Sequence, residues 1–327
     1  MTRLLLGNYP TPIELFSLAG DDGVTLFVKR DDQSSALYGG NKVRKLEWLL
    51  GAARDRGRRR ILTVGAVGSH QVVATALFGA HLGFDVEAVL VPQPASQHAA
   101  RNLHVALSHG LSAVAASTWT AIPALVPARM RPGTFFIPLG GSNALGSRGF
   151  VEAAAEVGAQ IARGEMPEPE AVVVALGSGG TVAGLATGFE KLGMRSRIIG
   201  VAISRPPAAL FALARVLTMR TAACAGLPYA AQLRAARRIE VAGDWVGPGY
   251  GYSTRDGRAA VAEAALAGLT LDPTYTAKAF ACALKLARES ARRGKTILYW
   301  HTLSTVPLDP LIDPSVEIPP NLARLLL

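Results

Sequence analysis

The sequence predicts an α/β protein whose sheets are mostly parallel. Short runs rich in β-branched residues alternate along the chain with longer stretches rich in Ala and Leu. Strands that alternate with helices in this way pack as parallel sheets covered by helices. The chain has 327 residues, of which 50% are hydrophobic. It is therefore long enough for two domains of this class and can bury a substantial core.

The predicted strands are short apolar runs, as expected for strands that are buried on both faces. Helices are expected between them. The first spans Lys42–Arg56, where Leu46, Leu49 and Leu50 share one face. Another opens at the segment LDPTYTAK, residues 271–278, and extends to about Arg293. The predicted strands span Val24–Lys29, Ile61–Val64, Val86–Val91, Phe135–Leu139, Ala171–Ala175, Ile198–Ser204 and Thr296–Trp300.

A TIM barrel is the alternative that strand–helix alternation leaves open. It is disfavoured because the spacing of the helical stretches is irregular. The long segment Arg205–Arg238 also lacks a clear strand. An open, mostly parallel arrangement, in two α/β domains or one large one, is the preferred prediction.

The net charge of +10 raises the question of nucleic-acid binding. The basic residues gather in one cluster, Arg54–Arg60, and are otherwise scattered as single residues. No aromatic residues interleave with that cluster, as a platform for single strands would require. The preferred interpretation is that these basic residues lie on a solvated surface. A basic surface also suits an anionic substrate or cofactor. A nucleic-acid module stays a third alternative.

Cysteine usage and the N-terminus indicate a cytoplasmic protein. The two cysteines, Cys224 and Cys282, form no CxxC pattern, so zinc and disulfide frameworks are unsupported. The apolar run at the N-terminus is too short for a signal peptide. No stretch reaches membrane-spanning length without a charge or a proline, so no membrane partner is expected.

Two glycines lead into the first predicted helix in the string YGGNKVRK, residues 38–45. Lys42 therefore lies near the positive end of a helix dipole, where the ammonium form is disfavoured and a nucleophilic amine is favoured. The alternative is a solvated lysine in the first turn.

A glycine-rich turn, GSGGT at residues 177–181, follows a predicted strand and opens a helix. Its backbone N–H groups can surround a phosphate, whose charge the helix N-terminus favours. The turn is no P-loop, because no lysine follows the glycines. A dinucleotide site is weakly supported, because Ser204 and Arg205 stand where an acidic residue would be expected.

Two further segments carry polar candidates. Ser69 and His70 lie between a strand and a helix, but the hydrolase motif G-x-S-x-G is absent. Ser69 is an N-cap in the simplest interpretation. Tyr275 opens a later helix and serves either as an acid–base group or as a core aromatic.

Together these segments resemble the 1-aminocyclopropane-1-carboxylate (ACC) deaminase/D-cysteine desulfhydrase family of pyridoxal 5'-phosphate (PLP) enzymes, which has fold type II, the fold of tryptophan synthase β. The resemblance runs from PTP at residues 10–12 to about Thr302. Its most specific part is KRDD at residues 29–32 followed by GGNKVRKLE at residues 39–47.

The resemblance implies a set of site residues. Lys42 would bind PLP covalently, and Ser69 would contact the substrate carboxylate or move protons. Tyr250, in GPGYG at residues 247–251, and Tyr275 would be active-site tyrosines. The residues expected to contact PLP are Lys42, Asn41, His70, Gly177, Ser178, Gly179, Gly180, Thr181, Thr276 and Thr302.

The resemblance also implies the architecture: two three-layer α/β domains with PLP in the cleft between them. A large PLP-binding domain would combine residues 1–45 and 148–327, and a small α/β domain would span residues 46–147. A homodimer is expected as well.

Three residues depart from the family pattern. His70 stands where Asn usually holds the PLP phenolic oxygen, and its imidazole could donate the same hydrogen bond. Leu303 replaces a glycine in HTLS, residues 301–304, and adds bulk near the cofactor ring. Thr276 stands where the deaminases have Glu and the desulfhydrase has Thr. A neutral group there makes PLP a weaker electron sink.

The implied activity is that of a lyase or deaminase in amino-acid metabolism. Lys42, or Ser69 working with it, would remove the α-proton of a small amino acid. A β-substituent would leave, giving a 2-oxo acid and ammonia, while Thr302 or Thr276 faces the pyridine nitrogen. β-Replacement, isomerisation, racemisation and ACC ring opening stay alternatives, as does a catalytically silent PLP-binding homologue.

Overall fold

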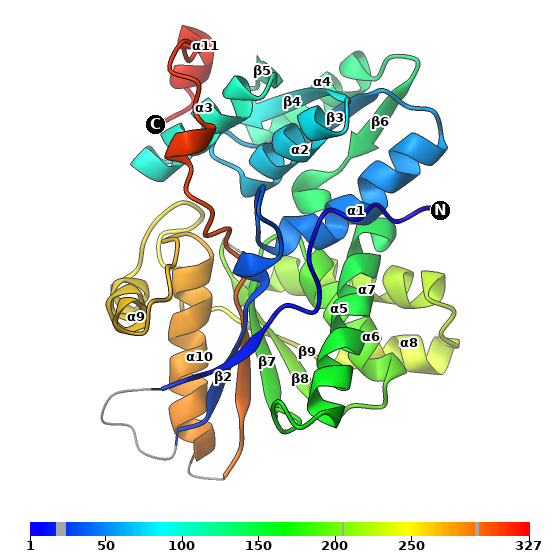
Figure 1. The fold of residues 1–327 in the computed structure, drawn as a ribbon, viewed down its shortest axis with the longest axis vertical. Coiled ribbons are helices and arrows are strands. Elements are labelled where there is room, and N and C mark those ends of the chain that lie inside the picture. The colour runs from blue at the N-terminus through cyan, green and yellow to red at the C-terminus, as the bar shows by residue number, and fades with distance from the viewer. Residues whose placement is uncertain (18–23, 205, 292–293) are drawn as a thin grey trace.

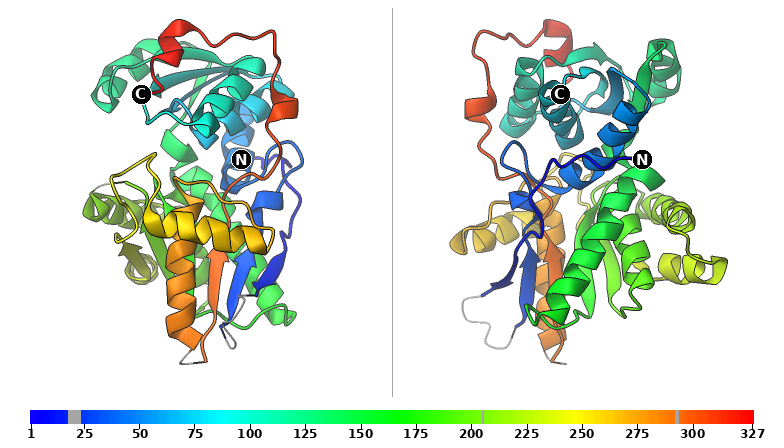
Figure 2. Two further views of the ribbon diagram at one scale, coloured as in Figure 1. Left: turned by 90° about the vertical axis from the view of Figure 1, so that its left-hand side faces the viewer. Right: turned by 45° about the vertical axis from the view of Figure 1, so that its right-hand side comes forward.

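The strands of the protein form two separate sheets. The computed structural model describes residues 1–17, 24–204, 206–291 and 294–327. Figure 1 shows one sheet in a larger lower unit and the other in a smaller upper unit, with helix α1 (Asn41–Asp55) at the junction. Figure 2 shows the same division from two other sides.

The larger unit has three layers around a six-stranded sheet. Its strands are β1 (Ile13–Phe16), β2 (Leu26–Lys29), β7 (Ala171–Leu176), β8 (Arg197–Ala202), β9 (Ile239–Ala242) and β10 (Ile297–Trp300). Its helices are α5 (Ala144–Ala162), α6 (Gly180–Lys191), α7 (Pro207–Cys224), α8 (Tyr229–Arg237), α9 (Arg255–Leu266) and α10 (Thr276–Ala291). The strand order is β1-β2-β10-β7-β8-β9, and only the β1–β2 pair is antiparallel. Val172 and Val174 of β7 pack with α5 and α6, whereas Val173 packs with α9 and α10, because successive residues of a strand point to opposite faces.

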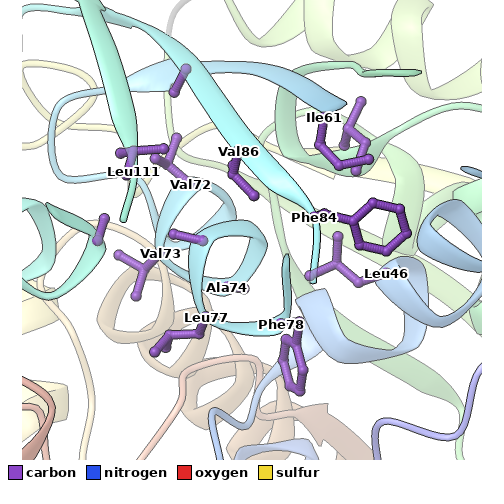
Figure 3. Packing of buried hydrophobic residues seen from close by; sticks show 14 of the residues in the cluster. Leu46, Ile61, Val72, Val73, Ala74, Leu77, Phe78, Phe84, Val86 and Leu111 are labelled. Carbon is purple, nitrogen blue, oxygen red and sulfur yellow. The ribbon is translucent and has the colours of Figure 1, made fainter. Parts of the chain in front are cut away.

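The smaller unit repeats this plan around a four-stranded parallel sheet. Its strands are β3 (Arg60–Ala66), β4 (Asp85–Val91), β5 (Ser112–Ala115) and β6 (Thr134–Ile137), in the order β5-β4-β3-β6. Its helices are α2 (His70–His81), α3 (Gln97–Ser108) and α4 (Ile122–Arg129). Figure 3 shows Val72 and Leu77 of α2 packed among Ile61, Val86 and the α1 residue Leu46. Helix α1 thus contributes to the small core while its N-terminus reaches the junction.

The C-terminal segment crosses from the larger unit to the smaller one. Helix α11 (Pro320–Ala323) carries Leu322, which is buried in the core of the smaller unit together with Leu325. The backbone of Gln93 exchanges hydrogen bonds with Leu325 and Leu327. We propose domain boundaries at residues 46–147 for the smaller unit, with the segment from about residue 307 packed on it as an extension.

The predicted fold class is confirmed: both sheets are mostly parallel and covered by helices, and the TIM barrel alternative is wrong. Each of the seven predicted strands overlaps an observed one, and the helix predicted over Lys42–Arg56 is α1. The segment that lacked a strand signal forms α7 and α8. Arg205, the first residue of that segment, and Arg293, the predicted end of the later helix, lie outside the described residues.

Three strands, β1, β5 and β9, escaped prediction, and each lies at an edge of its sheet. An edge strand is covered less completely, so its sequence needs fewer large apolar residues. Most residues of these three strands are exposed or half-buried, whereas β3, β4, β7 and β8 are almost wholly buried. The hydrophobic signal that predicts a central strand is therefore weak in them.

Helix α7 is long and apolar enough to cross a membrane, judged by length and composition alone. Within this structure it packs on α6 and α8 and buries Ala214 and Leu217 in the larger unit. Its exposed side carries Arg215 and Arg220. The packing covers only part of its apolar surface, because Leu213 and Val216 are exposed.

A buried charged cluster ties α1 to the larger unit. The guanidinium of Arg44, which is 2% exposed, donates to both carboxylate oxygens of Asp31 at 2.9 and 2.8 Å. It also donates to Glu156 of α5 at 2.9 Å. The indole of Trp300, at the end of β10, donates to Asp31 at 2.7 Å. Burial favours the neutral acid, but the charge and hydrogen bonds of Arg44 lower the pKa of Asp31 below its ordinary value.

The Arg44 cluster yields a prediction about stability. Arg44→Met leaves Asp31 and Glu156 without their guanidinium partner, and removing one member of a buried ion pair costs roughly 3–5 kcal/mol. The measurement is the free energy of unfolding in urea. The control is Arg163→Gln, because Arg163 pairs with Glu165 at the surface, where such pairs contribute about 0–1 kcal/mol. Equal stability of the two variants would contradict the structural importance of the cluster.

Candidate active site

A cavity of about 490 Å³ lies between the two units, at the carboxyl ends of the parallel strands. Ligand sites in open parallel sheets commonly form at this edge. Ala66 ends β3, Gly177 follows β7, and Thr302 follows β10. Of the predicted site residues, those that line the cavity are Asn41, Lys42, Ser69, His70, Gly177, Ser178, Gly179, Gly180, Thr181, Tyr250, Tyr275 and Thr302. Thr276 is not among the residues that line it.

The N-terminus of α1 places Lys42 in this cavity. Gly40 has a φ of 85°, and a side chain there would place its Cβ 2.6 Å from the carbonyl oxygen of Thr302. The backbone N–H of Asn41 donates to the same oxygen at 3.2 Å. Only glycine therefore lets α1 begin directly against the end of β10.

The surroundings of Lys42 favour its neutral amine. Burial lowers the pKa of Lys42 to about 8, and the carboxylate of Asp272 offsets only part of that lowering. A larger fraction of neutral amine at physiological pH makes this lysine a better nucleophile and base. The expected nucleophile thus lies in the cavity in a reactive form.

The GSGGT turn forms a cradle at the N-terminus of α6. Gly179 has a φ of 84°. A Cβ on Gly180 would lie 2.5 Å from Ser142 Oγ and 3.0 Å from Lys45 Nζ, so the space beside Gly180 is bounded by polar groups. Ser142 Oγ lies 2.7 Å from Ser178 Oγ and accepts from the N–H of Gly180 at 3.1 Å. Hydroxyls and the positive end of a helix converge here, as an anion requires.

Lys45 is a site residue that the sequence analysis did not assign. It is buried, and its Nζ contacts the carbonyl of Gly140 and the hydroxyl of Ser142, both at 3.1 Å. Burial and the nearby Lys42 hold the pKa of Lys45 well below its ordinary value. An anion in the cradle would supply the missing negative charge. The sequence signal that could have identified Lys45 is its position three residues after Lys42, because residues i and i+3 share a helix face.

Ser69 and His70 enter the cavity from the start of α2. Ser69 occupies the N-cap position, but its side chain makes no capping hydrogen bond. Its hydroxyl is therefore open to a ligand. His70 is engaged on both sides, because Nδ1 lies 2.6 Å from the hydroxyl of Tyr38 and Nε2 lies 3.0 Å from Nε2 of His98.

The two tyrosines of the larger unit meet in the cavity. The hydroxyls of Tyr250 and Tyr275 lie 2.7 Å apart. Burial raises the pKa of Tyr250 to about 12 and that of Tyr275 well above its ordinary value, so both are protonated phenols at neutral pH. Buried Lys278 holds the loop that carries Tyr250, since its Nζ donates to the carbonyls of Val246 and Gly249 at 2.9 and 2.8 Å.

Asp272 is a second residue that the sequence analysis left unassigned. Its carboxylate lines the cavity, and four groups of its own turn donate to it: the backbone N–H groups of Thr274, Tyr275 and Thr276 and the Thr276 hydroxyl, at 2.6 to 3.1 Å. Burial opposes ionisation, but these hydrogen bonds lower the pKa of Asp272. The hydroxyl of Thr276 is thus engaged with Asp272, whereas Thr302 lines the cavity.

Comparisons with known proteins agree with this geometry. Two D-cysteine desulfhydrases from strains of Klebsiella pneumoniae are each 36% identical to this chain, with 92% of the chain and 93% of the relative covered. A D-cysteine desulfhydrase from Salmonella choleraesuis is 35% identical over the same shares.

Solved structures share the fold. A structure described as an ACC deaminase homologue has a TM-score of 0.76 and 28% identity, covering 95% of this chain and 96% of its own. A hydrogen sulfide-producing enzyme from Fusobacterium nucleatum has a TM-score of 0.65 at 18% identity, covering 92% and 94%. The second likeness concerns the fold alone.

The resemblance inferred from the sequence is confirmed by these relatives and by a match to a protein family. Residues 4–302 match the family described as "Pyridoxal-phosphate dependent enzyme". The match covers both units and every residue of the cavity except Leu303. The chain therefore belongs to the pyridoxal-phosphate-dependent enzymes, and its cofactor is pyridoxal 5'-phosphate.

Proposed function

We propose that this enzyme removes the α-proton of a small amino acid and expels its β-substituent, giving a 2-oxo acid and ammonia. The observation that carries the proposal is the convergence, in one cavity, of Lys42, the anion cradle and the hydroxyls of Ser69, Tyr250 and Tyr275. D-Cysteine desulfhydrases, named for such an elimination, are 35–36% identical to the chain.

The residues present fit PLP. Lys42 would hold its aldehyde carbon covalently, and the backbone of Gly177–Thr181 with Lys45 would hold its phosphate. The second assignment is supported by the close approach of Ser142 and Lys45 to Gly180, which leaves no room for a Cβ there. When bound, PLP supplies an electron sink for the charge that develops at the α-carbon.

The protein groups account for the proton movements. Lys42 would be the base that takes the α-proton, because burial lowers its pKa to about 8 and thereby raises the fraction of its amine that is neutral. The open hydroxyl of Ser69 would contact the substrate carboxylate or pass a proton to Lys42. Tyr250 and Tyr275, which are both protonated, would hold the substrate and donate hydrogen bonds to it.

The neutral surroundings expected for the pyridine nitrogen favour β-elimination. We assign Thr302 to face that nitrogen, because the Thr276 hydroxyl donates to Asp272 at 2.6 Å. The carboxylate of Asp272 accepts four hydrogen bonds from its own turn, which fills its acceptor sites. Neither group would keep the ring nitrogen protonated, so the electron sink is weaker than one paired with a carboxylate.

Other PLP reactions share the first steps. β-Replacement, racemisation and isomerisation also begin with α-proton removal, and a silent PLP-binding protein would keep only the binding groups. We further propose, on family resemblance, a homodimer located in the cytoplasm. Sedimentation that gives the 34.2 kDa mass of a single chain would contradict the dimer.

The assignment of Lys42 is tested by chemical labelling. Borohydride reduction of the PLP-loaded enzyme followed by peptide mapping should find the pyridoxyl group on Lys42, because among the described residues its Nζ has no hydrogen-bond partner, whereas that of Lys45, which also lines the cavity, contacts Gly140 and Ser142. Lys42→Ala should carry no label. Lys45→Ala is the matched control: it should keep the label on Lys42 but bind PLP more weakly. A label on Lys45 or Lys278 would refute the assignment.

The cradle is tested at Gly180. Gly180→Ala should weaken PLP binding at least tenfold, a cost of about 1.4 kcal/mol, because its Cβ would lie 2.5 Å from Ser142 Oγ and would displace the serine that contacts Ser178 and Lys45. Gly158→Ala is the control, since its Cβ would meet only the flexible end of Leu192. Fluorescence titration of the apoenzyme measures the affinity. An unchanged affinity in a folded Gly180→Ala variant would count against this cradle.

The reaction is tested with a substrate series. A weaker electron sink should suffice to expel a β-substituent that leaves readily, but not to open the strained cyclopropane ring. We expect pyruvate from β-chloroalanine or cysteine of one chirality, and little or no 2-oxobutyrate from 1-aminocyclopropane-1-carboxylate. Both enantiomers are assayed beside the cyclopropane substrate. Efficient ring opening by the unmodified protein would overturn the argument from Thr276 and Thr302.

A further inference from the structure

A line of three hydrogen-bonding side chains runs along the wall of the cavity. The hydroxyl of Tyr38 lies 2.6 Å from Nδ1 of His70, and Nε2 of His70 lies 3.0 Å from Nε2 of His98. Tyr38 precedes α1, His70 opens α2, and His98 lies on α3. The line therefore connects three elements that are distant in sequence, and both ring nitrogens of His70 are used within it.

The chemistry of the neighbours gives each hydrogen bond a direction. Burial raises the pKa of Tyr38 far above its ordinary value, so the phenol keeps its proton and can donate to Nδ1 of His70. A neutral imidazole that accepts at Nδ1 carries its proton on Nε2. That N–H can then donate to His98. The amide nitrogen of Asn102, which donates to the carbonyl of Gly68 at 2.9 Å, also lies 3.3 Å from Nε2 of His98, and a donor there favours a lone pair over a proton on that nitrogen.

His70 stands between two cavities. Besides the main cavity, it lines a second cavity of about 220 Å³, and Asp272 and Leu303 also line both. Its ring meets the ring of Tyr275 nearly edge-on, with centroids 5.9 Å apart. The position of this ring therefore sets the shape of the wall beside the two tyrosines.

We infer that Tyr38 and His98 are positioning residues that hold His70 as a neutral imidazole protonated on Nε2. His70 then shapes the wall of the cavity and has no N–H left for a ligand. The hydrogen bond to the PLP phenolic oxygen, expected of His70 from its place in the sequence, is not available in this arrangement. That last consequence rests on the proposed function, whereas the protonation state of His70 does not.

The charged groups around the line oppose its protonation. Lys42 on α1 faces His70. Asp272 and Tyr275, in the turn before α10, also face His70, and Arg101 lies near His98. Burial first, and then the neighbouring His98, lower the pKa of His70 to about 3, although Asp272 acts in the opposite direction. A proton added to Nε2 of His98 would point at the N–H of His70.

The pH dependence follows from this lowered pKa. Between the ordinary pKa of a histidine, about 6.5, and about 3, the unfolded chain binds a proton that the folded protein does not. The stability associated with His70 is therefore complete above about pH 6.5 and is lost as the pH falls toward 3.

Nitrogen-15 NMR of the histidine rings tests the inference. The chain has six histidines, and the signals of His70 are assigned with His70→Asn. We expect an unprotonated Nδ1 and a protonated Nε2, with no titration between about pH 8 and about pH 5. Tyr38→Phe should redistribute the proton between the two nitrogens, whereas the exposed His81→Asn should leave the His70 signals unchanged. A proton on Nδ1 in the unmodified protein, or titration near the ordinary pKa, would overturn the inference.

Adding PLP separates this inference from the proposed function. In the loaded enzyme the His70 signals should keep the same pattern, because neither nitrogen contacts the cofactor. A shift showing that Nε2–H now donates to PLP would overturn the inference while leaving the enzyme assignment intact. Failure of PLP to bind, with the Nε2–H form of His70 still present, would refute the proposed function and leave the inference standing. The unmodified protein supplies the decisive spectrum even where Tyr38→Phe fails to fold.

Discussion

The buried Arg44 guanidinium is the interaction on which the rest of the site depends. It joins Asp31, which precedes α1, to Glu156 of α5, and Asp31 in turn accepts from Trp300 at the end of β10. Arg44 lies two residues after Lys42, in the first turn of α1. A cluster that fixes this turn against β10 therefore also fixes the reactive lysine. Its charges are balanced inside the protein, as buried ions require.

Electrostatics divides the cavity into two regions. Toward the N-terminus of α6, two serine hydroxyls and the buried Lys45 provide only positive or neutral groups, which suits a phosphate. Toward α10, the carboxylate of Asp272 lies among phenols and imidazoles. Lys42 lies near both regions. Burial lowers its pKa by more than the attraction to Asp272 raises it. The same low-polarity surroundings keep the tyrosines protonated.

Two of the three residues that depart from the family pattern, His70 and Leu303, line the same part of the cavity. His70 and Leu303 both line the main cavity and the smaller cavity behind it. Tyr38 and His98 complete the hydrogen bonding of His70. These hydrogen bonds hold His70 beside Tyr275, with the two ring centroids 5.9 Å apart.

The sequence by itself determined the fold class and the central strands, and it placed Lys42 and the GSGGT turn at the N-termini of two helices. These features depend on local signals: buried apolar runs, glycines where a side chain would clash, and a lysine in the first turn of a helix. Only the tertiary structure decided which polar groups share partners. Thr276 is turned to Asp272, His70 is held by residues 32 and 28 positions away, and Lys45 faces a serine 97 positions away. The edge strands and the return of the C-terminal segment to the smaller unit also needed the structure. Such contacts depend on how distant segments pack, and no periodicity in a single segment records them.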